Sequence, residues 1–450
     1  MKQKTFQTTL LCMVLLLVSG VFAQTPITNT KYALSVQQTV DFGAKNNVQV
    51  KNALLNLQIQ QQTNRGITAA ALPNLSANGS FTDYINIPTS LLPGEFFGQP
   101  AGTYIPVKFG TKYNASSSVK LEQLLFDGQI FIGLKARKTT IDFQTKNIEV
   151  TEEAIKANIY KVYYQLVASK TQITLIDANL ARLAKLQHDA TELYKNGFAE
   201  KLDIDKITVQ IANLKTQKIS VVNNIAIGYL GLKTLIGMPV KDTLTLTDTL
   251  SDAKIKEGIL QDAPYQYEDR KDYQYAQLGK KLGEFNIRRY KLAYLPTLSA
   301  SGVYSKQAQR TDFSFFKGGD WYTTSFVGLN LNVPIFSGFA KDAKVKQSML
   351  ELKQTENNIE NLQRIIDNDV STALLNFNAA VSTMDYQKQN MVLAETVYNQ
   401  TKKKFEIGTG SNTEITSAQT DLITAETNYI NALYSAIIAK VDYQKAIGKL

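Results

Sequence analysis

The chain has 450 residues, of which 49 are Lys or Arg and 39 are Asp or Glu, so its formal net charge is +10. It contains one cysteine, Cys12, and one histidine, His188. A disulfide framework and a thiolate metal site are therefore excluded, and a transition-metal site is not expected. His188 is expected to be an exposed helical histidine without a functional role.

Residues 1–23 have the features of a secretory signal peptide. Lys2 and Lys4 form the positive segment, 10–18 form a short apolar core, and Val21-Phe22-Ala23 supplies a small-residue cleavage site. The apolar core is too short to span a membrane as a helix. The cysteine lies inside this core and not at the cleavage point, so a cleaved and unlipidated exported protein is predicted.

The remaining chain has no stretch of about 18 consecutive apolar residues, so no further helical membrane span is predicted. Loss of Lys2 and Lys4 lowers the formal charge from +10 to +8. This charge would suit contact with anionic lipid headgroups, but an even spread over long solvated helices is the favoured interpretation. No basic cluster interleaved with aromatics indicates a nucleic-acid partner.

Two long windows, 107–238 and 335–450, contain no proline. Apolar residues in them recur at spacings of three and four, which is typical of helices packed as coiled coils. Examples are Ile173, Ile176, Leu180, Leu183, Ala190; Ile207, Ile211, Leu214, Val221; and Leu362, Ile366, Val370, Ala373, Phe377. We therefore expect long helical hairpins at 129–238 and 339–450. A helix over 129–195 would be on the order of 100 Å long.

Four segments alternate with period two, which predicts strands at about 75–85, 113–125, 297–308 and 323–333. Each has about ten residues, the length of a tilted strand that crosses a bilayer. An amphipathic strand in a soluble sandwich would show the same alternation. Polar, aromatic and glycine-rich loops are expected between the paired strands, at 87–112 and 309–322.

The two halves of the chain repeat. Leu72-Pro73-Asn74-Leu75-Ser76-Ala77 recurs as Leu295-Pro296-Thr297-Leu298-Ser299-Ala300, and Ile236-Gly237 recurs as Ile447-Gly448. We expect a first repeat at 24–238 and a second at 264–450, joined by a linker at 239–263 with a weak strand signal at 243–250. Four strands per chain would leave unpaired edges in lipid, so a membrane location would require several chains to pool their strands.

Several of these segments together resemble the TolC-like family of outer-membrane efflux proteins. The resemblance covers essentially the whole mature chain, and it rests on order, spacing and duplication. One departure is Lys271, where the family usually has proline. The segments that carry it are 32–40 with 44 and 46–47, 71–75, 269–273, 294–298, Tyr194-x-x-Gly197 and Phe405-x-x-Gly408-x-Gly410.

The resemblance implies an α+β fold in which a β-barrel is continued by a long α-helical barrel. Three chains would contribute four strands each, giving twelve strands in the outer membrane of a Gram-negative bacterium, and the linker would form part of an equatorial belt. The helices would cross the periplasm to dock a periplasmic adaptor (membrane fusion protein) and an inner-membrane transporter. The implied function is a passive exit duct for efflux or type I secretion, without a cofactor and without enzymatic activity.

The turns between the long helices are the candidate docking sites. The resemblance assigns Tyr194, Gly197, Phe405, Gly408 and Gly410 to helical tips that an adaptor would contact. The three glycines also have a simple structural explanation, since positive φ is common where helices end.

Acids beside the tips are the candidate gate. The resemblance places Glu414 and the equivalent Asp203 at the periplasmic entrance, where three carboxylates around one axis would bias a pore toward cations. Ser417 replaces the second acid of the family doublet, and Gly410 replaces a gating arginine. Both acids could instead favour the first turn of their helices, and Ser411 with Glu414 fits a capping box.

Three other classes of protein are alternatives to a duct. A structural coiled-coil protein of the periplasm, without a pore, would contain the same heptad seams. A carbohydrate-processing envelope enzyme is disfavoured because no carboxylate pair is held across a cleft, and no nucleophile, phosphate-binding or dinucleotide motif is present. A simple porin is disfavoured because most of the chain reads as helix.

Overall fold

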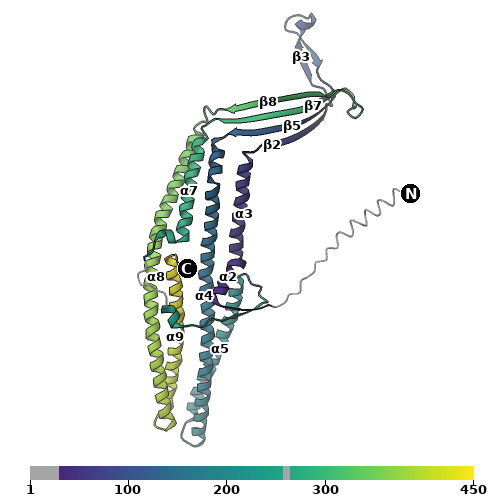
Figure 1. Cartoon of the computed structure of the whole chain (residues 1–450). Helices are drawn as coiled ribbons and strands as arrows, with labels where there is room; N and C mark the ends of the chain where they lie inside the picture. Colours follow the sequence, from purple (N-terminus) through teal and green to yellow (C-terminus); the bar gives the residue numbers. More distant parts are fainter. Residues whose placement is uncertain (1–29, 257–263) are drawn as a thin grey trace, which may run out of the picture.

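A computed structural model describes residues 30–256 and 264–450, so the predicted signal peptide lies outside the described residues. Long helices extend from one side of a four-stranded sheet and end in two turns at the opposite end of the molecule (Figure 1). The architecture is therefore a helical rod attached to a small sheet.

The helices occur in three pairs of nearly equal length. The pairs are α3 (Val48–Ala69) with α7 (Lys271–Leu292), α4 (Gly128–Lys195) with α8 (Ala340–Glu406), and α5 (Lys201–Leu235) with α9 (Asn412–Ala446). Their lengths are 22 and 22, 68 and 67, and 35 and 35 residues. A shorter helix, α2 (Val36–Asn46), precedes α3. Each half of the chain thus builds the same set of long helices.

The sheet combines one strand pair from each half. It contains β2 (Asn74–Asp83), β5 (Tyr113–Phe126), β7 (Thr297–Arg310) and β8 (Tyr322–Asn332) in the order β2-β5-β7-β8, with every neighbour antiparallel. The expected combination of long helices with four antiparallel strands is confirmed. Within the described chain, β2 and β8 each have a neighbour on one side only.

The segment 87–112, expected to be a loop, contains two further strands. β3 (Thr89–Pro93) and β4 (Tyr104–Lys108) pair antiparallel around a short 3₁₀ turn, η1 (Gly94–Phe97). The expectation of a loop over 87–112 was wrong because both strands are only five residues long, Pro93 ends β3 and Pro106 lies inside β4, so neither shows a clear alternation. This hairpin projects from the end of the main sheet that is distant from the helices (Figure 1).

The linker is tied to the first residues of the described chain by a small parallel sheet. β1 (Lys31–Leu34) pairs with β6 (Thr243–Leu246), which lies inside the segment where weak alternation indicated a strand. Leu244 and Leu246 point into the protein, while the threonines between them are exposed. A short helix, α6 (Asp252–Lys256), and a 3₁₀ turn, η2 (Tyr267–Asp269), complete the described part of the linker region.

The long helices form a layer whose order changes along its length. Near the sheet the contacts run α3 to α4, α4 to α7 and α7 to α8. Toward the turns α5 and α9 take the places of α3 and α7, and the contacts run α5 to α4, α4 to α9 and α9 to α8. One lateral edge of the molecule is therefore β2, α3 and α5, and the other is β8 and α8.

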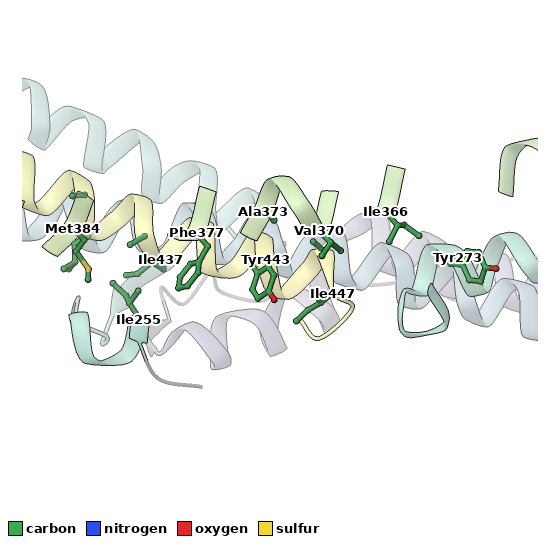
Figure 2. Close-up of a cluster of buried hydrophobic side chains, with 14 of the residues drawn as sticks. Ile255, Tyr273, Ile366, Val370, Ala373, Phe377, Met384, Ile437, Tyr443 and Ile447 are labelled. Carbon is green, nitrogen blue, oxygen red and sulfur yellow. The ribbon is translucent and has the colours of Figure 1, made fainter. Parts of the chain in front are cut away.

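Equivalent apolar residues build two cores at the middle of the rod. In the second repeat Ile366, Val370, Phe377, Tyr443 and Ile447 are buried together (Figure 2). At an offset of 211 residues, Ile155, Ile159, Leu166, Leu232 and Ile236 form the core of the first repeat. Burial at these heptad positions is the main force that pairs the helices, since propensity alone stabilises long helices weakly.

Tyrosines fasten the linker region to both long helices. Tyr163 of α4 donates a hydrogen bond to Asp248, at 2.8 Å, and Tyr265 donates one to Asp367 of α8, at 2.6 Å. The bond to Asp367 raises the pKa of the Tyr265 hydroxyl to about 12. Both tyrosines therefore remain neutral donors at physiological pH.

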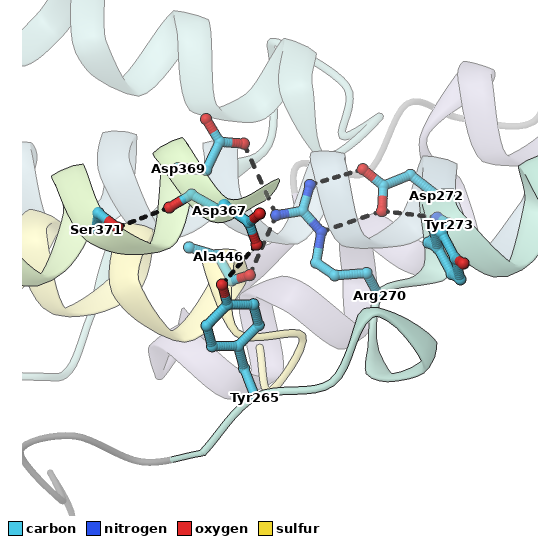
Figure 3. Close-up of polar contacts among 8 residues, drawn as sticks. All are labelled: Tyr265, Arg270, Asp272, Tyr273, Asp367, Asp369, Ser371 and Ala446. Carbon is cyan, nitrogen blue, oxygen red and sulfur yellow. Dashed lines mark hydrogen bonds and ion pairs between the residues drawn. The ribbon is translucent and has the colours of Figure 1, made fainter. Parts of the chain in front are cut away.

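A buried arginine fixes the start of α7. Arg270 donates to both carboxylate oxygens of Asp272, at 3.0 and 2.6 Å, and to the carbonyl of Ala446 at 3.1 Å (Figure 3). Asp369 of α8 lies 3.8 Å away. These contacts hold the C-terminal end of α9 against the start of α7, and so join the two ends of the second repeat.

Candidate functional site: the helical tips

The two turns at the far end of the helices have the same hydrogen bonds. After α4, Gly197 has φ of +80° and the Phe198 amide donates to the Leu193 carbonyl at 2.8 Å. After α8, Gly408 has φ of +77° and the Thr409 amide donates to the Lys404 carbonyl at 2.9 Å. Glycine takes this left-handed conformation without the steric penalty of a Cβ, which explains both positions.

Gly410 has a different role from the one expected. Its φ is not positive, whereas a Cβ at this position would lie 2.9 Å from the Phe405 backbone nitrogen and 3.0 Å from the Lys404 Cβ. The expectation that all three tip glycines take positive φ was therefore wrong for Gly410. A close approach of the chain to the end of α8 requires this glycine.

The aromatic residues before the turns are not equivalent in the structure. Phe405 is buried, with 9% of its surface exposed, whereas Tyr194 is 45% exposed. Phe405 packs in a cluster with residues of α4, α5 and α9, so its first role is to join the two helical hairpins. Of the two aromatics, only Tyr194 presents substantial surface to a partner at the tip.

The two candidate gate acids cap their own helices. The Glu414 amide donates to the Ser411 hydroxyl at 3.2 Å, and the Ser411 amide donates to the Glu414 carboxylate at 3.3 Å. This is the capping box that the sequence predicted, which is confirmed. The Asp203 carboxylate likewise accepts from the Glu200 amide at 3.3 Å. Ser417 lies one turn after Glu414 and is exposed like it.

A buried polar cluster, which sequence reasoning missed, connects α4 to α9 above the turns. Asn179 donates to Glu426 at 2.6 Å and Arg182 donates to the other Glu426 oxygen at 2.9 Å. Gln419 donates to Asn179 at 2.8 Å. Glu426 is only 8% exposed on its side chain, so the charge-assisted bonds from Arg182 and Asn179 offset its desolvation.

Heptad spacing could have revealed this cluster. Asn412, Gln419 and Glu426 lie seven residues apart on α9, and all three are buried. The amide of the Asn412 side chain donates to the Asp203 carbonyl at 3.3 Å, which links the start of α9 to the start of α5. Polar residues at successive core positions indicate a specific register between helices, here between the two hairpins.

A groove of about 580 Å³ separates the two tips. Lys185 and Leu193 of α4 line one side, and Glu406 and Ile407 at the end of α8 line the other. Lys185 lies 4.0 Å from Glu406 across the groove. Ile407 is 74% exposed, so the mouth of the groove presents an apolar side chain to a partner.

Residues 30–256 and 264–450 contain no group of three or more His, Cys, Asp or Glu side chains that could hold a metal ion. His188 is exposed on α4. The polar residues at the tips are arranged as caps and as contacts between helices.

No helix within these described ranges is both long and apolar enough to cross a membrane.

Known proteins are similar to this chain in sequence. The family model described as "Outer membrane efflux protein" matches residues 268–449. TolC of Vibrio cholerae is 19% identical over 337 residues, which cover 74% of this chain and 77% of that protein. The probable efflux pump outer membrane protein TtgC of Pseudomonas putida is 21% identical over 421 residues, covering 92% and 83%.

Solved structures show the same fold. The structure of CusC aligns with a TM-score of 0.75 at 14% identity, covering 95% of both chains. The Campylobacter jejuni outer membrane channel CmeC aligns with a TM-score of 0.71 at 17% identity, covering 95% of this chain and 90% of that one. At this level of identity the similarity concerns the arrangement of helices and strands.

The fold and the sequence similarities are those of outer-membrane channels that take part in efflux or secretion. Residues 268–449 match the outer membrane efflux protein family, and the longer sequence is similar to TolC proteins of Gram-negative bacteria.

Proposed function

We propose that three copies of this chain form a duct through the outer membrane that docks a periplasmic adaptor and an inner-membrane transporter at its helical tips. The observation that carries this proposal is that both lateral edges of the chain, β2 with α5 and β8 with α8, lack a neighbour within the described chain. The two edges are complementary in their strands and in the apolar surfaces of their helices. We also propose the organisation into repeats at 24–238 and 264–450, a linker at 239–263, and a cleaved, unlipidated signal peptide at 1–23.

The sheet edges support a ring of subunits. β2 and β8 are the outer strands of an antiparallel sheet with an even number of strands, so β2 of one copy can pair antiparallel with β8 of the next. Unpaired strand edges are unfavourable in lipid, and a head-to-tail contact closes into a ring when the rotation permits.

The two faces of the sheet differ in polarity. Leu75 pairs with Leu121, and Val327, Leu329 and Leu331 continue the same apolar face on β8. The opposite face carries mainly serine and asparagine, including Ser76, Asn78, Ser118, Ser301 and Asn330. A closed sheet with the apolar face toward lipid would enclose a polar lumen.

The helix edges carry matching apolar stripes. On α5, Leu202, Val209 and Ile227 lie opposite the buried seam of that helix and are exposed. On α8, Leu375, Tyr386 and Leu393 lie opposite its buried seam and are also exposed. Large exposed apolar surface of this kind marks an interaction site, and these two stripes would cover each other between neighbouring copies.

The tips are the proposed docking sites for the adaptor. Tyr194 is exposed, Gly197, Gly408 and Gly410 shape the turns, and Phe405 holds the two hairpins together beside the groove. The groove lined by Lys185, Glu406 and Ile407 offers both charge and apolar surface to the hairpin of a partner. Glu414, Asp203 and Ser417 remain candidates for the entrance, where carboxylates of three copies would face one axis.

Crosslinking tests the number of copies. Since the only cysteine lies in the predicted signal peptide, cysteines introduced at Ser76 and Asn330 can be bridged with a bismaleimide after membrane isolation. We expect products of two and three chains and none larger. Single cysteines at either position should give no trimer, and an open-ended ladder or uncrosslinked monomers would contradict a closed ring.

Capture in cells tests the partners. A photoreactive crosslinker attached to cysteines at Lys195 and Thr409, both exposed at the tips, should capture an adaptor. The same crosslinker at Lys306 of β7, at the opposite end of the molecule, is the matched control and should not. Capture of the same protein from Lys306 and from the tip positions would argue against docking at the tips.

A further inference from the structure

The positive charge of the chain is concentrated where the helices meet the sheet. The twelve helical residues nearest the sheet on α3, α4, α7 and α8 (58–69, 128–139, 281–292 and 340–351) contain eleven Lys or Arg and three acids. Their net charge of +8 equals that of the whole chain without Lys2 and Lys4. The charge is thus gathered at one level and not spread evenly, as composition had suggested.

The cations of this level lack carboxylate partners. Among the eleven, only Lys346 forms an ion pair within the described ranges, with Asp342 at 2.9 Å. Farther along the rod, lysines commonly pair with acids, as Lys161 does with Asp442 at 2.8 Å. The acids of the level are Glu284, Asp342 and Glu351, and Asp127 caps α4 beside it, so the acids remain fewer than the cations.

Four of these cations lie on free helix faces. α4 contacts α3 through Thr140 and α7 through Phe143, whose ring stacks on Tyr275 at 4.2 Å. With about 100° per residue, Lys138 lies on the side of α4 opposite these contacts, and Lys135 lies between Lys138 and the contact with α7. Both are exposed.

The free face of α7 is likewise defined by its contacts with its two neighbours. It contacts α4 through Tyr275 and α8 through Lys280, which lies 3.3 Å from Glu356. Lys281 and Arg288, seven residues apart and both exposed, lie on the side opposite these contacts.

The free faces of α4 and α7 point to the same side of the helix layer. α4 runs away from the sheet and α7 runs toward it, and the right-handed winding of both helices places their free faces on one side. On each helix the two contact faces are less than half a turn apart. In a closed ring, the directions from one helix to its two neighbours make an angle of less than 180° on the side that faces the lumen. The cations lie on the other side of α4 and α7, which is the outer surface of the ring.

Exposed aromatic residues lie between these cations and the sheet. Phe131, seven residues before Lys138 on the same face of α4, is 51% exposed. Tyr294, Phe336 and Phe339 are exposed at the ends of the neighbouring elements. Apolar strand face, aromatic residues and cations follow one another in the order of a bilayer core, its interface and its headgroups.

We propose that Lys135, Lys138, Lys281 and Arg288 form a belt that binds the anionic headgroups of phospholipids in the leaflet nearest the helices. This proposal rests on the proposed duct, because it requires the sheet to lie in the membrane. Lysine and arginine near an anionic surface attract phosphate-bearing headgroups over a distance of about one Debye length.

Native mass spectrometry of the full-length protein in neutral detergent tests the belt. Phosphatidylglycerol and phosphatidylcholine of the same acyl chains are added separately to the parent and to a variant with Lys135→Gln, Lys138→Gln, Lys281→Gln and Arg288→Gln. The matched control changes four exposed tip lysines, Lys201→Gln, Lys206→Gln, Lys215→Gln and Lys403→Gln. We expect the preference of the belt variant for phosphatidylglycerol over phosphatidylcholine to fall at least about tenfold. The control should keep the preference of the parent.

An unchanged preference in the belt variant, or an equal loss in the control, would overturn the proposal. Complete displacement of phosphatidylglycerol by inorganic phosphate at the same concentration would also overturn it, because the cations would then bind any free phosphate anion. Conductance of the same proteins in planar bilayers separates the two proposals. If the belt variant forms channels with a changed ion selectivity but keeps the lipid preference of the parent, the cations lie in the lumen. In that case the belt is contradicted, while the proposed duct is not. Absence of channels from the parent protein would contradict the duct itself.

Discussion

α5 and α9 have the same length and follow the same kind of turn, yet they are buried to very different extents. α5 buries four residues, whereas α9 buries fifteen. The equivalent positions Val222 and Leu433 show the difference, since Val222 is 49% exposed and Leu433 is 3% exposed. α9 lies between α4 and α8, while α5 lies at the lateral edge of the layer.

This contrast shows how two similar halves acquire different roles. A repeated helix at the centre of the layer is covered by its own chain, and the same helix at the edge keeps an apolar surface that a neighbouring copy would cover. Polar core residues follow the same division. Gln419 and Glu426 are buried on α9, while the corresponding α5 positions, Thr208 and Lys215, are exposed.

The largest difference is expected from Leu433→Ala against Val222→Ala. Removal of the buried leucine side chain leaves a cavity and should lower the free energy of unfolding by about 3 kcal/mol. Val222→Ala should lower it by less than about 1 kcal/mol. Thermal unfolding of the purified proteins measures both. Equal losses of stability in Leu433→Ala and Val222→Ala would remove the distinction between the helices.

The buried polar cluster should give the next largest effect. Glu426→Ala leaves Arg182 and Asn179 without their acceptor and should destabilise the protein by about 2 to 3 kcal/mol, the partial exposure of Arg182 limiting the loss. The counterpart Lys215→Ala should change stability by less than about 0.5 kcal/mol. Chemical denaturation compares the two, and Glu426→Gln, which keeps an oxygen for Asn179, should recover part of the loss. Similar values for Glu426→Ala and Lys215→Ala would mean that the cluster does not join the hairpins.

Substitution of the positive-φ glycine should destabilise the two turns equally, because both turns have the same backbone conformation and hydrogen bonds. Gly197→Ala and Gly408→Ala each force an alanine to adopt positive φ and should destabilise their hairpins by about 1 kcal/mol. Hydrogen exchange of the adjoining helix ends measures each turn separately. An effect at only one turn would show that the two tips are not equivalent in solution.

The smallest expected effect depends on pH and is confined to the first repeat. Burial raises the pKa of Glu152, helped by the charge of Glu149, and burial raises the pKa of Glu153. Each group disfavours its charged form in the folded protein, so its unfavourable contribution is absent below the unfolded pKa and grows as pH rises through the folded pKa.

A double substitution measures this contribution. Glu152→Gln with Glu153→Gln should therefore raise stability near neutral pH by less than about 1 kcal/mol and have no effect near pH 4. The difference in thermal unfolding between variant and parent across pH tests this. The equivalent positions, Gln363 and Arg364, carry no acid, so Gln363→Ala should show no such dependence.

The long helices and the main sheet could be predicted because each depends on a repeated local pattern. The seams containing Ile176 and Leu183, or Ile366 and Phe377, follow from heptad spacing, and the alternation of Val327, Leu329 and Leu331 follows from strand geometry. The β3–β4 hairpin could not be predicted, because two prolines interrupt its short strands. The pairing of β1 with β6 could not be predicted either, because its partners are more than 200 residues apart.

The candidate site could be predicted only in part. The glycines of the turns and the capping box of Glu414 follow from local rules. The different environments of Tyr194 and Phe405 depend on the order of the helices in the layer, which the repeat itself does not reveal. The contacts of Asn179 with Gln419 and Glu426 join residues about 240 positions apart, and sequence analysis missed them, although the heptad spacing on α9 could have indicated them.

The mass of the assembled protein tests the central claim most directly. Native mass spectrometry of the full-length protein extracted in mild detergent should give three chains per particle. A variant with Val209→Lys and Ile227→Lys, which places charges on the free stripe of α5, should give folded single chains with unchanged helicity. A parent protein that is monomeric, or that forms a continuous series of larger assemblies, would contradict a closed ring built from the two lateral edges.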